Sequence, residues 1–343
     1  MGDGADARRS DQRAKSRMNR KLIIVGNGLG MALDQKHFSL DNALAEIWNK
    51  EGFLNRKQKI LIGRCLGRKG APAGEHELDR LHLAITYCKA LNQIGAGKTH
   101  WLTKNGQNFP DITARYIHKV ATKLHNYNGG LPCEFETALV EFVKKTKSHV
   151  ATLNYDKLLY KSFIDNNVFG RYNNASLVDG MVDTGFSAKH LERKYGNTFG
   201  YYLHLHGSPL FVNHGECVKK LSRNGLTIDS DEASEHIVLT HVKHKPSVIA
   251  ASHVLSTYWD YLRFALSEVN GLILFGYSGE DKHLNEILRP YLTATPVQVV
   301  EWSGAGEQAE RNAFWQELLG RSVQVNRLDS ITDFKQWQSA SPS

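Results

Sequence analysis

Short runs of apolar residues alternate along the chain with stretches whose apolar residues recur at helical spacing. Such runs, bounded by polar or glycine-rich turns, predict buried strands. The predicted strands are Leu22–Val25, His149–Leu153, Tyr201–Leu205, Ile237–Thr240, Leu272–Phe275, Val297–Val300 and Val323–Val325. Helical patterns lie between them, including one helix over Val248–Leu266 that Ser247 can cap. This alternation predicts an α/β fold with a Rossmann-like, doubly wound and mostly parallel sheet.

One long stretch, residues 40–148, contains helical patterns and no strand pattern. We therefore expect a helical subdomain inserted after the first strand. Residues 21–39 and 149–343 then form the Rossmann-like domain. Residues 1–20 form a basic tail with almost no apolar residues, which we expect to be disordered.

Composition narrows the class of protein. The chain has 343 residues, of which 41% are hydrophobic and 23% charged, and a formal net charge of +8. That charge is compatible with an anionic partner such as a nucleotide or nucleic acid. No apolar run approaches the ~20 residues that cross a bilayer, so we expect a cytoplasmic protein without membrane contact. The four cysteines form no C-x-x-C pair, which indicates neither a zinc site nor a disulfide framework.

A glycine-rich turn follows the first predicted strand. It consists of Gly26, Asn27, Gly28, Leu29 and Gly30. Glycines at such a position let the backbone turn sharply and let a phosphate approach closely. The spacing differs from the G-x-G-x-x-G pattern of dehydrogenases, and a simple tight turn explains it as well.

Polar residues follow several other predicted strands. Asn154 and Asp156 suit ligand binding or the start of a helix, and His206 suits a general base. His204 shares a strand face with His206, but no third metal ligand has suitable spacing. The later strand ends carry Gly276, Tyr277, Ser278, Gly279 and Asp281, then Glu301 and Trp302, and a basic patch of His241, Lys243, His244 and Lys245 follows Thr240. Ser278 with Asp281 also fits a capping box, and Trp302 fits either base stacking or the core. Because ligands bind beyond the carboxyl ends of parallel strands, we expect one composite site.

Taken in order, these motifs resemble the sirtuin family, specifically its branch of sirtuin-like NAD hydrolases in bacterial antiphage defence, of the HerA-associated and Thoeris types. The matching segments are Gly26–Gly30, Leu153–Asp156, Leu205–Ser208 and Phe275–Asp281. The resemblance implies that Asn154 and His206 are the catalytic pair, with Asp156 beside the nicotinamide. It also implies that NAD is bound by Gly26, Asn27, Gly28, Leu29, Gly30, Gly207, Gly276, Tyr277, Ser278, Asp281 and Trp302.

The function implied by the resemblance is hydrolysis of NAD, the substrate, without a metal, in a homo-oligomer. It further implies a HerA-type ATPase or DNA translocase as partner and, through it, an indirect contact with nucleic acid. The zinc module of sirtuin deacylases is missing, which argues against deacylation of lysine. Two alternatives remain open: a module that senses NAD or ADP-ribose without turnover, and a DNA-processing subunit favoured by the basic tail.

Overall fold

The structure is a computed structural model that describes residues 19–95, 99–170, 175–228, 234, 236–239, 244–293 and 295–338. Residues 1–18 of the predicted tail lie outside the described residues, as do Thr240, His241 and Lys243.

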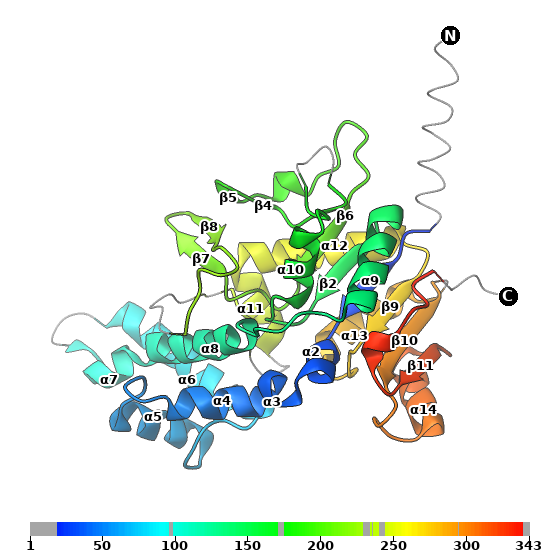
Figure 1. The fold of residues 1–343 in the computed structure, drawn as a ribbon. Coiled ribbons are helices and arrows are strands. Elements are labelled where there is room, and N and C mark those ends of the chain that lie inside the picture. Colours follow the sequence, from blue (N-terminus) through cyan, green and yellow to red (C-terminus); the bar gives the residue numbers. More distant parts are fainter. Residues whose placement is uncertain are drawn as a thin grey trace, which may run out of the picture.

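A seven-stranded parallel sheet forms the centre of the molecule (Figure 1). Its order is β11-β10-β9-β1-β2-β6-β3. The strands are β1 (Leu22–Val25), β2 (His149–Thr152), β3 (Leu177–Val178), β6 (Gly200–His204), β9 (Leu272–Phe275), β10 (Val297–Trp302) and β11 (Gln324–Leu328). β2, β6 and β3 extend the sheet on one side of β1, whereas β9, β10 and β11 extend it on the other. The direction of winding therefore reverses at β1. The predicted α/β, Rossmann-like, doubly wound fold is confirmed.

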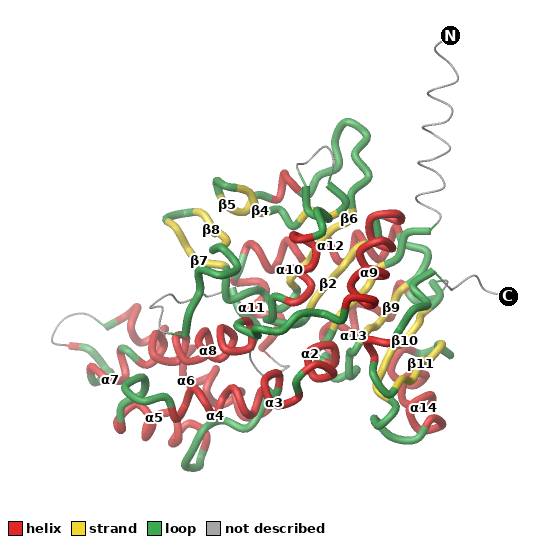
Figure 2. The backbone as a smooth tube through the Cα atoms, in the orientation of Figure 1, coloured by secondary structure: helices red, strands yellow, loops and turns green. Residues whose placement is uncertain are grey.

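Alternate residues of each central strand enter opposite cores, so β1 is buried on both sides. Leu22 and Ile24 pack with α12 (His253–Glu268), α13 (Lys282–Leu288) and α14 (Gln308–Leu319). Ile23 and Val25 pack with α9 (Cys133–Thr146) and α10 (Leu158–Asp165) on the other face. Figure 2 shows these helices on either side of the yellow strands.

The inserted helices form a unit with a core of its own beside the sheet (Figure 1). They are α4 (Leu40–Asn49), α5 (Arg56–Leu66), α6 (Leu78–Ile94), α7 (Lys104–Gln107) and α8 (Phe109–His125), and η1 (Glu75–Glu77) precedes α6. Tyr155, Ile237 and Leu239 from the sheet domain join this core. α9 packs against the sheet instead, so by packing the helical unit ends near His125, before the predicted boundary at residue 148.

Two sequence predictions about elements were wrong. Ile237 makes only an isolated bridge to Gly207, and the described residues 237–239 form no strand, because Ile237 and Leu239 pack into the core of the inserted helices. The predicted helix Val248–Leu266 is two helices, α11 (Lys245–Ala251) and α12. Ser252 breaks it, since its Oγ accepts the Leu255 N–H and caps α12.

The sequence analysis missed β3, an edge strand of the central sheet, and several small elements outside that sheet. The short helix α2 (Gly28–Leu33) follows the glycine turn, and the missed elements after it are α3 (Gln35–Phe38) and two antiparallel pairs between β3 and α11. These pairs are β4 (Met181–Val182) with β5 (Gly185–Phe186), and β7 (Phe211–His214) with β8 (Cys217–Lys220).

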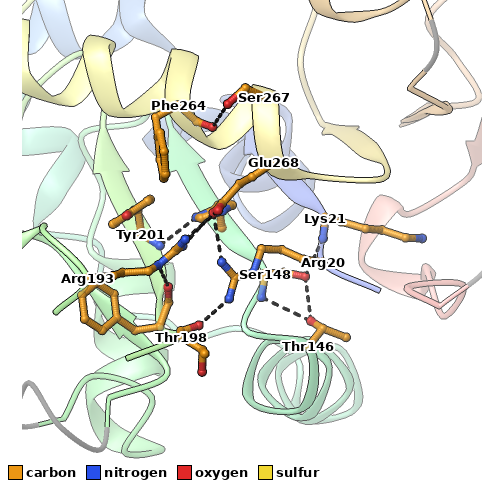
Figure 3. Close-up of polar contacts among 12 residues, drawn as sticks. Arg20, Lys21, Thr146, Ser148, Arg193, Thr198, Tyr201, Phe264, Ser267 and Glu268 are labelled. Carbon is orange, nitrogen blue, oxygen red and sulfur yellow. Dashed lines mark hydrogen bonds and ion pairs between the residues drawn. The ribbon is translucent and has the colours of Figure 1, made fainter. Parts of the chain in front are cut away.

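A cluster of charged side chains closes the amino end of the sheet (Figure 3). Glu268, at the end of α12, accepts hydrogen bonds from Arg20 (2.9 Å), Arg193 (2.6 and 2.7 Å) and His149 Nε2 (2.6 Å). His149 Nδ1 accepts the Tyr201 N–H, so the ring proton lies on Nε2, facing Glu268. Burial lowers the pKa of His149 to about 4, which keeps the imidazole neutral. The cluster joins β1, β2, β6 and α12 at the end of the sheet opposite the predicted site.

Candidate functional site

A cavity of about 1090 Å³ lies at the carboxyl ends of the central strands, where the winding reverses at β1. This is the position at which open α/β sheets bind ligands. The inserted helices contribute part of its wall through Leu40, Leu124 and the segment Gly74–His76. Most of the predicted site residues line it: Gly26, Asn27, Gly28, Asn154, Asp156, His206, Gly276, Tyr277, Ser278, Asp281 and Trp302. The motifs scattered along the sequence are therefore brought to one place.

The two glycine turns at the cavity lie against each other. A Cβ on Gly26 or Gly28 would lie 2.7 Å from the Gly276 carbonyl oxygen. Gly276 has a φ of +58°, which favours glycine, and accepts the Gly28 N–H at 2.8 Å. Gly26 N–H is bonded to the Phe275 carbonyl at 2.9 Å. These two amides are thus used inside the protein, and the glycines leave room for a ligand without offering those donors to it.

Three predicted residues lie beside the cavity without lining it. The Leu29 side chain is fully buried in the sheet core. Gly30 makes room for Phe38, whose ring would be 2.6 Å from an added Cβ. Gly207 has a φ of +80°, and a Cβ there would lie 1.7 Å from the His236 carbonyl oxygen. Leu29 therefore contributes to the core, and Gly30 and Gly207 permit close contacts of their turns with Phe38 and His236.

Asn154 and Asp156 present acceptors with no partner among the described residues. Asn154 Nδ2 donates to the Gly26 carbonyl at 3.0 Å, while its buried Oδ1 is unpaired. Asp156 Oδ1 accepts the Leu158 N–H at 2.9 Å, and its buried Oδ2 is unpaired. Burial raises the pKa of Asp156 to about 6. Because unpaired buried acceptors cost free energy, these two atoms are suited to donors supplied by a ligand.

His206 is paired with a buried carboxylate. Its Nε2 lies 2.9 Å from Asp281 Oδ2, and Asp281 Oδ1 accepts the Leu284 N–H at 3.1 Å and caps α13. Burial alone would raise the pKa of Asp281, but the hydrogen bond from His206 and the charge of Lys245 hold it well below its ordinary value. The predicted capping box was wrong, because Asp281 itself is the N-cap and Ser278 Oγ accepts the Glu280 N–H.

Two charged residues at the cavity, Glu75 and Lys245, were not predicted as part of the site. Lys245, at the start of α11, lies 3.0 Å from Asp281 Oδ2 and 3.1 Å from Glu75 Oε2. The basic patch in the sequence includes Lys245 but gives no sign that it meets Asp281 or Glu75.

The far end of the cavity carries Glu301 and Trp302 from β10. Glu301 is buried. Its carboxylate accepts bidentate hydrogen bonds from Arg311 and one hydrogen bond from Trp315 Nε1 at 2.9 Å. Its charge is therefore balanced inside the protein. Trp302 is 59% exposed and lines the cavity, so it offers an aromatic face that is not part of the core.

The described residues contain no group of three or more His, Cys, Asp or Glu side chains placed to hold a metal ion. Among the helices that the structure describes, none has the length and apolar composition needed to cross a bilayer.

A Rossmann-like sheet with a large cavity at its switch point defines a protein of the nucleotide-binding α/β class. The family model of the SIR2-like domain matches residues 148–319, half of the chain, and the chain belongs to this family. The matched range contains Asn154, Asp156, His206, Lys245 and Asp281, whereas the first glycine turn precedes it. SIR2-like domains use NAD, which indicates an NAD-dependent enzyme. A search of curated proteins gave no match.

Proposed function

We propose that this chain is an NAD+ glycohydrolase, which cleaves the nicotinamide–ribose bond with water and releases nicotinamide and ADP-ribose. One observation carries the proposal: two unpaired buried acceptors, Asn154 Oδ1 and Asp156 Oδ2, share a cavity with the His206–Asp281 pair. Cleavage of a glycosyl bond needs groups that hold the leaving group and activate water, and these side chains are of the types that can do so.

Asp156 is suited to hold the leaving group. Its unpaired Oδ2 can accept an N–H from the carboxamide of nicotinamide, which fixes the ring relative to the ribose. The enclosed position that raises the pKa of Asp156 also strengthens such a hydrogen bond, because little water competes for it.

Asn154 and His206 are suited to handle the attacking water. Asn154 Oδ1 can accept a hydrogen bond from water or from a ribose hydroxyl. Because Asp281 is ionised, it takes the N–H of His206 Nε2, which leaves Nδ1 to accept a proton. The water oxygen bonds to the ribose carbon, nicotinamide leaves with the electron pair of the broken bond, and the proton released by the water passes to His206. The transition state is oxocarbenium-like, as in other glycoside cleavages.

We extend the proposal to a biological role on the strength of the motif resemblance. In this role the chain depletes NAD as an effector of antiphage defence. It acts in a homo-oligomer and is regulated by a HerA-type ATPase, through which it contacts nucleic acid indirectly.

The test is release of nicotinamide from NAD by the wild type, Asn154→Ala and His206→Ala, with and without DNA and the partner ATPase. Both variants should lose turnover while their circular dichroism spectra stay unchanged. His214→Ala, which removes an exposed histidine of β7, is the control and should keep full activity. Undiminished activity in both site variants contradicts the assignment. Bound NAD with no release under any condition favours a sensor.

A further inference from the structure

A line of charged contacts runs from the inserted helices to His206. Glu75 in η1 pairs with Lys245 at 3.1 Å, Lys245 pairs with Asp281 at 3.0 Å, and Asp281 pairs with His206 at 2.9 Å. The side chains of Lys245, Asp281 and His206 are 4%, 5% and 7% exposed, whereas Glu75 is 33% exposed. The three inner groups are thus shielded from solvent, and the outer one belongs to the inserted unit.

The Asp281 carboxylate is fixed at both of its oxygens. Oδ1 accepts the Leu284 N–H, and Oδ2 is shared by His206 Nε2 and Lys245 Nζ. Burial alone would lower the pKa of Lys245, but the carboxylates of Glu75 and Asp281 raise it above its ordinary value, so Lys245 stays charged. A buried cation on the same oxygen opposes the negative charge that Asp281 presents to His206.

We propose that Lys245 is a positioning residue for His206, and that Glu75 makes this arrangement depend on how the inserted helices lie against the sheet. Lys245 orients Asp281 and opposes its charge, so that Asp281 holds His206 by Nε2 and leaves Nδ1 available as a base. This inference rests on the proposed function.

A second contact holds the same end of α11 to the inserted helices. His244 Nε2 lies 2.6 Å from Asp79 Oδ1, and the His244 ring stacks on His82 with centroids 4.2 Å apart. Contacts with η1 and the first turns of α6 therefore hold residues 244 and 245 in place. A displacement of these elements breaks the Glu75–Lys245 pair and alters the charge balance at Asp281. Among the described residues, Tyr155, Tyr277 and His283 are further titratable groups that interact with Asp281.

The experiment compares wild type, Lys245→Met, Lys245→Arg and Glu75→Gln. Lys245→Met should lower kcat roughly tenfold at pH 7, with little change in KM. It should also move the acid limb of the pH–rate profile to higher pH by roughly one unit, because the unopposed Asp281 holds a proton on His206. Lys245→Arg should restore much of the activity. Glu75→Gln should give a smaller shift in the opposite direction, because Lys245 then opposes the charge of Asp281 alone.

Lys282→Met is the matched control. It also replaces a lysine by methionine, but Lys282, which follows Asp281 in the sequence, has an exposed side chain. NMR titration of the His206 ring in each variant is a readout that does not depend on turnover. If His206 titrates at the same pH in Lys245→Met as in Lys282→Met, the inference is overturned. A wild type that releases no nicotinamide refutes the proposed function instead, and the NMR shift still decides the role of Lys245. If Lys245→Met does not fold, Glu75→Gln must move the acid limb to lower pH, or the inference fails.

Discussion

Replacement of Glu268 by Gln tests whether the charged cluster at the amino end of the sheet stabilises the fold. The substitution keeps the shape of the side chain but removes the charge that faces Arg20 and Arg193. The Arg20 side chain is only 3% exposed, so its guanidinium remains buried without its counter-charge. Breaking a buried ion pair in this way costs about 3–5 kcal/mol. Glu268 is 19% exposed and Gln keeps one acceptor for His149, so we expect the lower end, about 3 kcal/mol.

The assay is urea unfolding at pH 7, followed by circular dichroism, with the free energy of unfolding taken from midpoint and slope. Asp260→Asn is the control on the same helix, because it breaks an exposed pair with Arg263 whose side chains are 77% and 44% exposed. That change should cost well under about 1 kcal/mol. If Glu268→Gln is no more destabilising than this control, the reasoning is refuted.

The pH dependence gives a second check on the same variant. Burial would raise the pKa of Glu268, but hydrogen bonds from His149 and Arg193 hold it well below its ordinary value. A carboxylate with a lowered folded-state pKa stabilises the fold above its unfolded pKa and loses that contribution as the pH falls. The difference between wild type and Glu268→Gln should therefore shrink below about pH 4. A difference that stays constant down to acid unfolding contradicts this account.

Two further predictions concern the site. Gly28→Ala places a Cβ 2.7 Å from the Gly276 backbone, so it should destabilise the fold by about 1–3 kcal/mol and weaken NAD binding in calorimetry. Gly130→Ala, where an added Cβ meets nothing within 4 Å, should do neither, and equal behaviour of the two variants would count against the close contact. Asp156→Asn should stabilise the protein by up to about 3 kcal/mol at pH 8, because a folded-state pKa raised to about 6 means that the ionised form destabilises the fold as the pH rises. The gain should vanish below pH 4, while nicotinamide release falls, and an equal gain at both pH values would exclude titration of Asp156 as its cause.

The central strands β1, β2, β6 and β9 were predictable because they are buried on both faces, whereas the edge strand β3 was missed. A strand such as Leu22–Val25 must be apolar at every position, which makes it visible without knowledge of its neighbours. The same signal fails for Ile237, where the apolar residues serve the core of the inserted helices and not a sheet. The helical pattern of apolar residues also continues through Ser252. It therefore does not reveal that α11 ends there and that Ser252 caps a new helix, α12.

The candidate site was predictable only in part. Residues such as Asn154 and His206 follow apolar strands, so the rule that ligands lie at strand ends places them together. The pairing of Asp281 with His206 and Lys245 joins residues 75 and 36 positions apart, and no local pattern records such a contact. For the same reason the sequence did not show that the amides of Gly26 and Gly28 are bonded to the Phe275–Gly276 turn.

The contact between the two glycine turns also limits how this protein can be divided or recombined. Gly26 and Gly28 come from the start of the chain, and Gly276 comes from the matched SIR2-like range, yet neither turn has room for a side chain while the other is in place. A side chain in either turn therefore requires the backbone of the other turn to move. A chimera that takes β1 from one relative and β9 from another should fold only if both parents keep glycine at these positions.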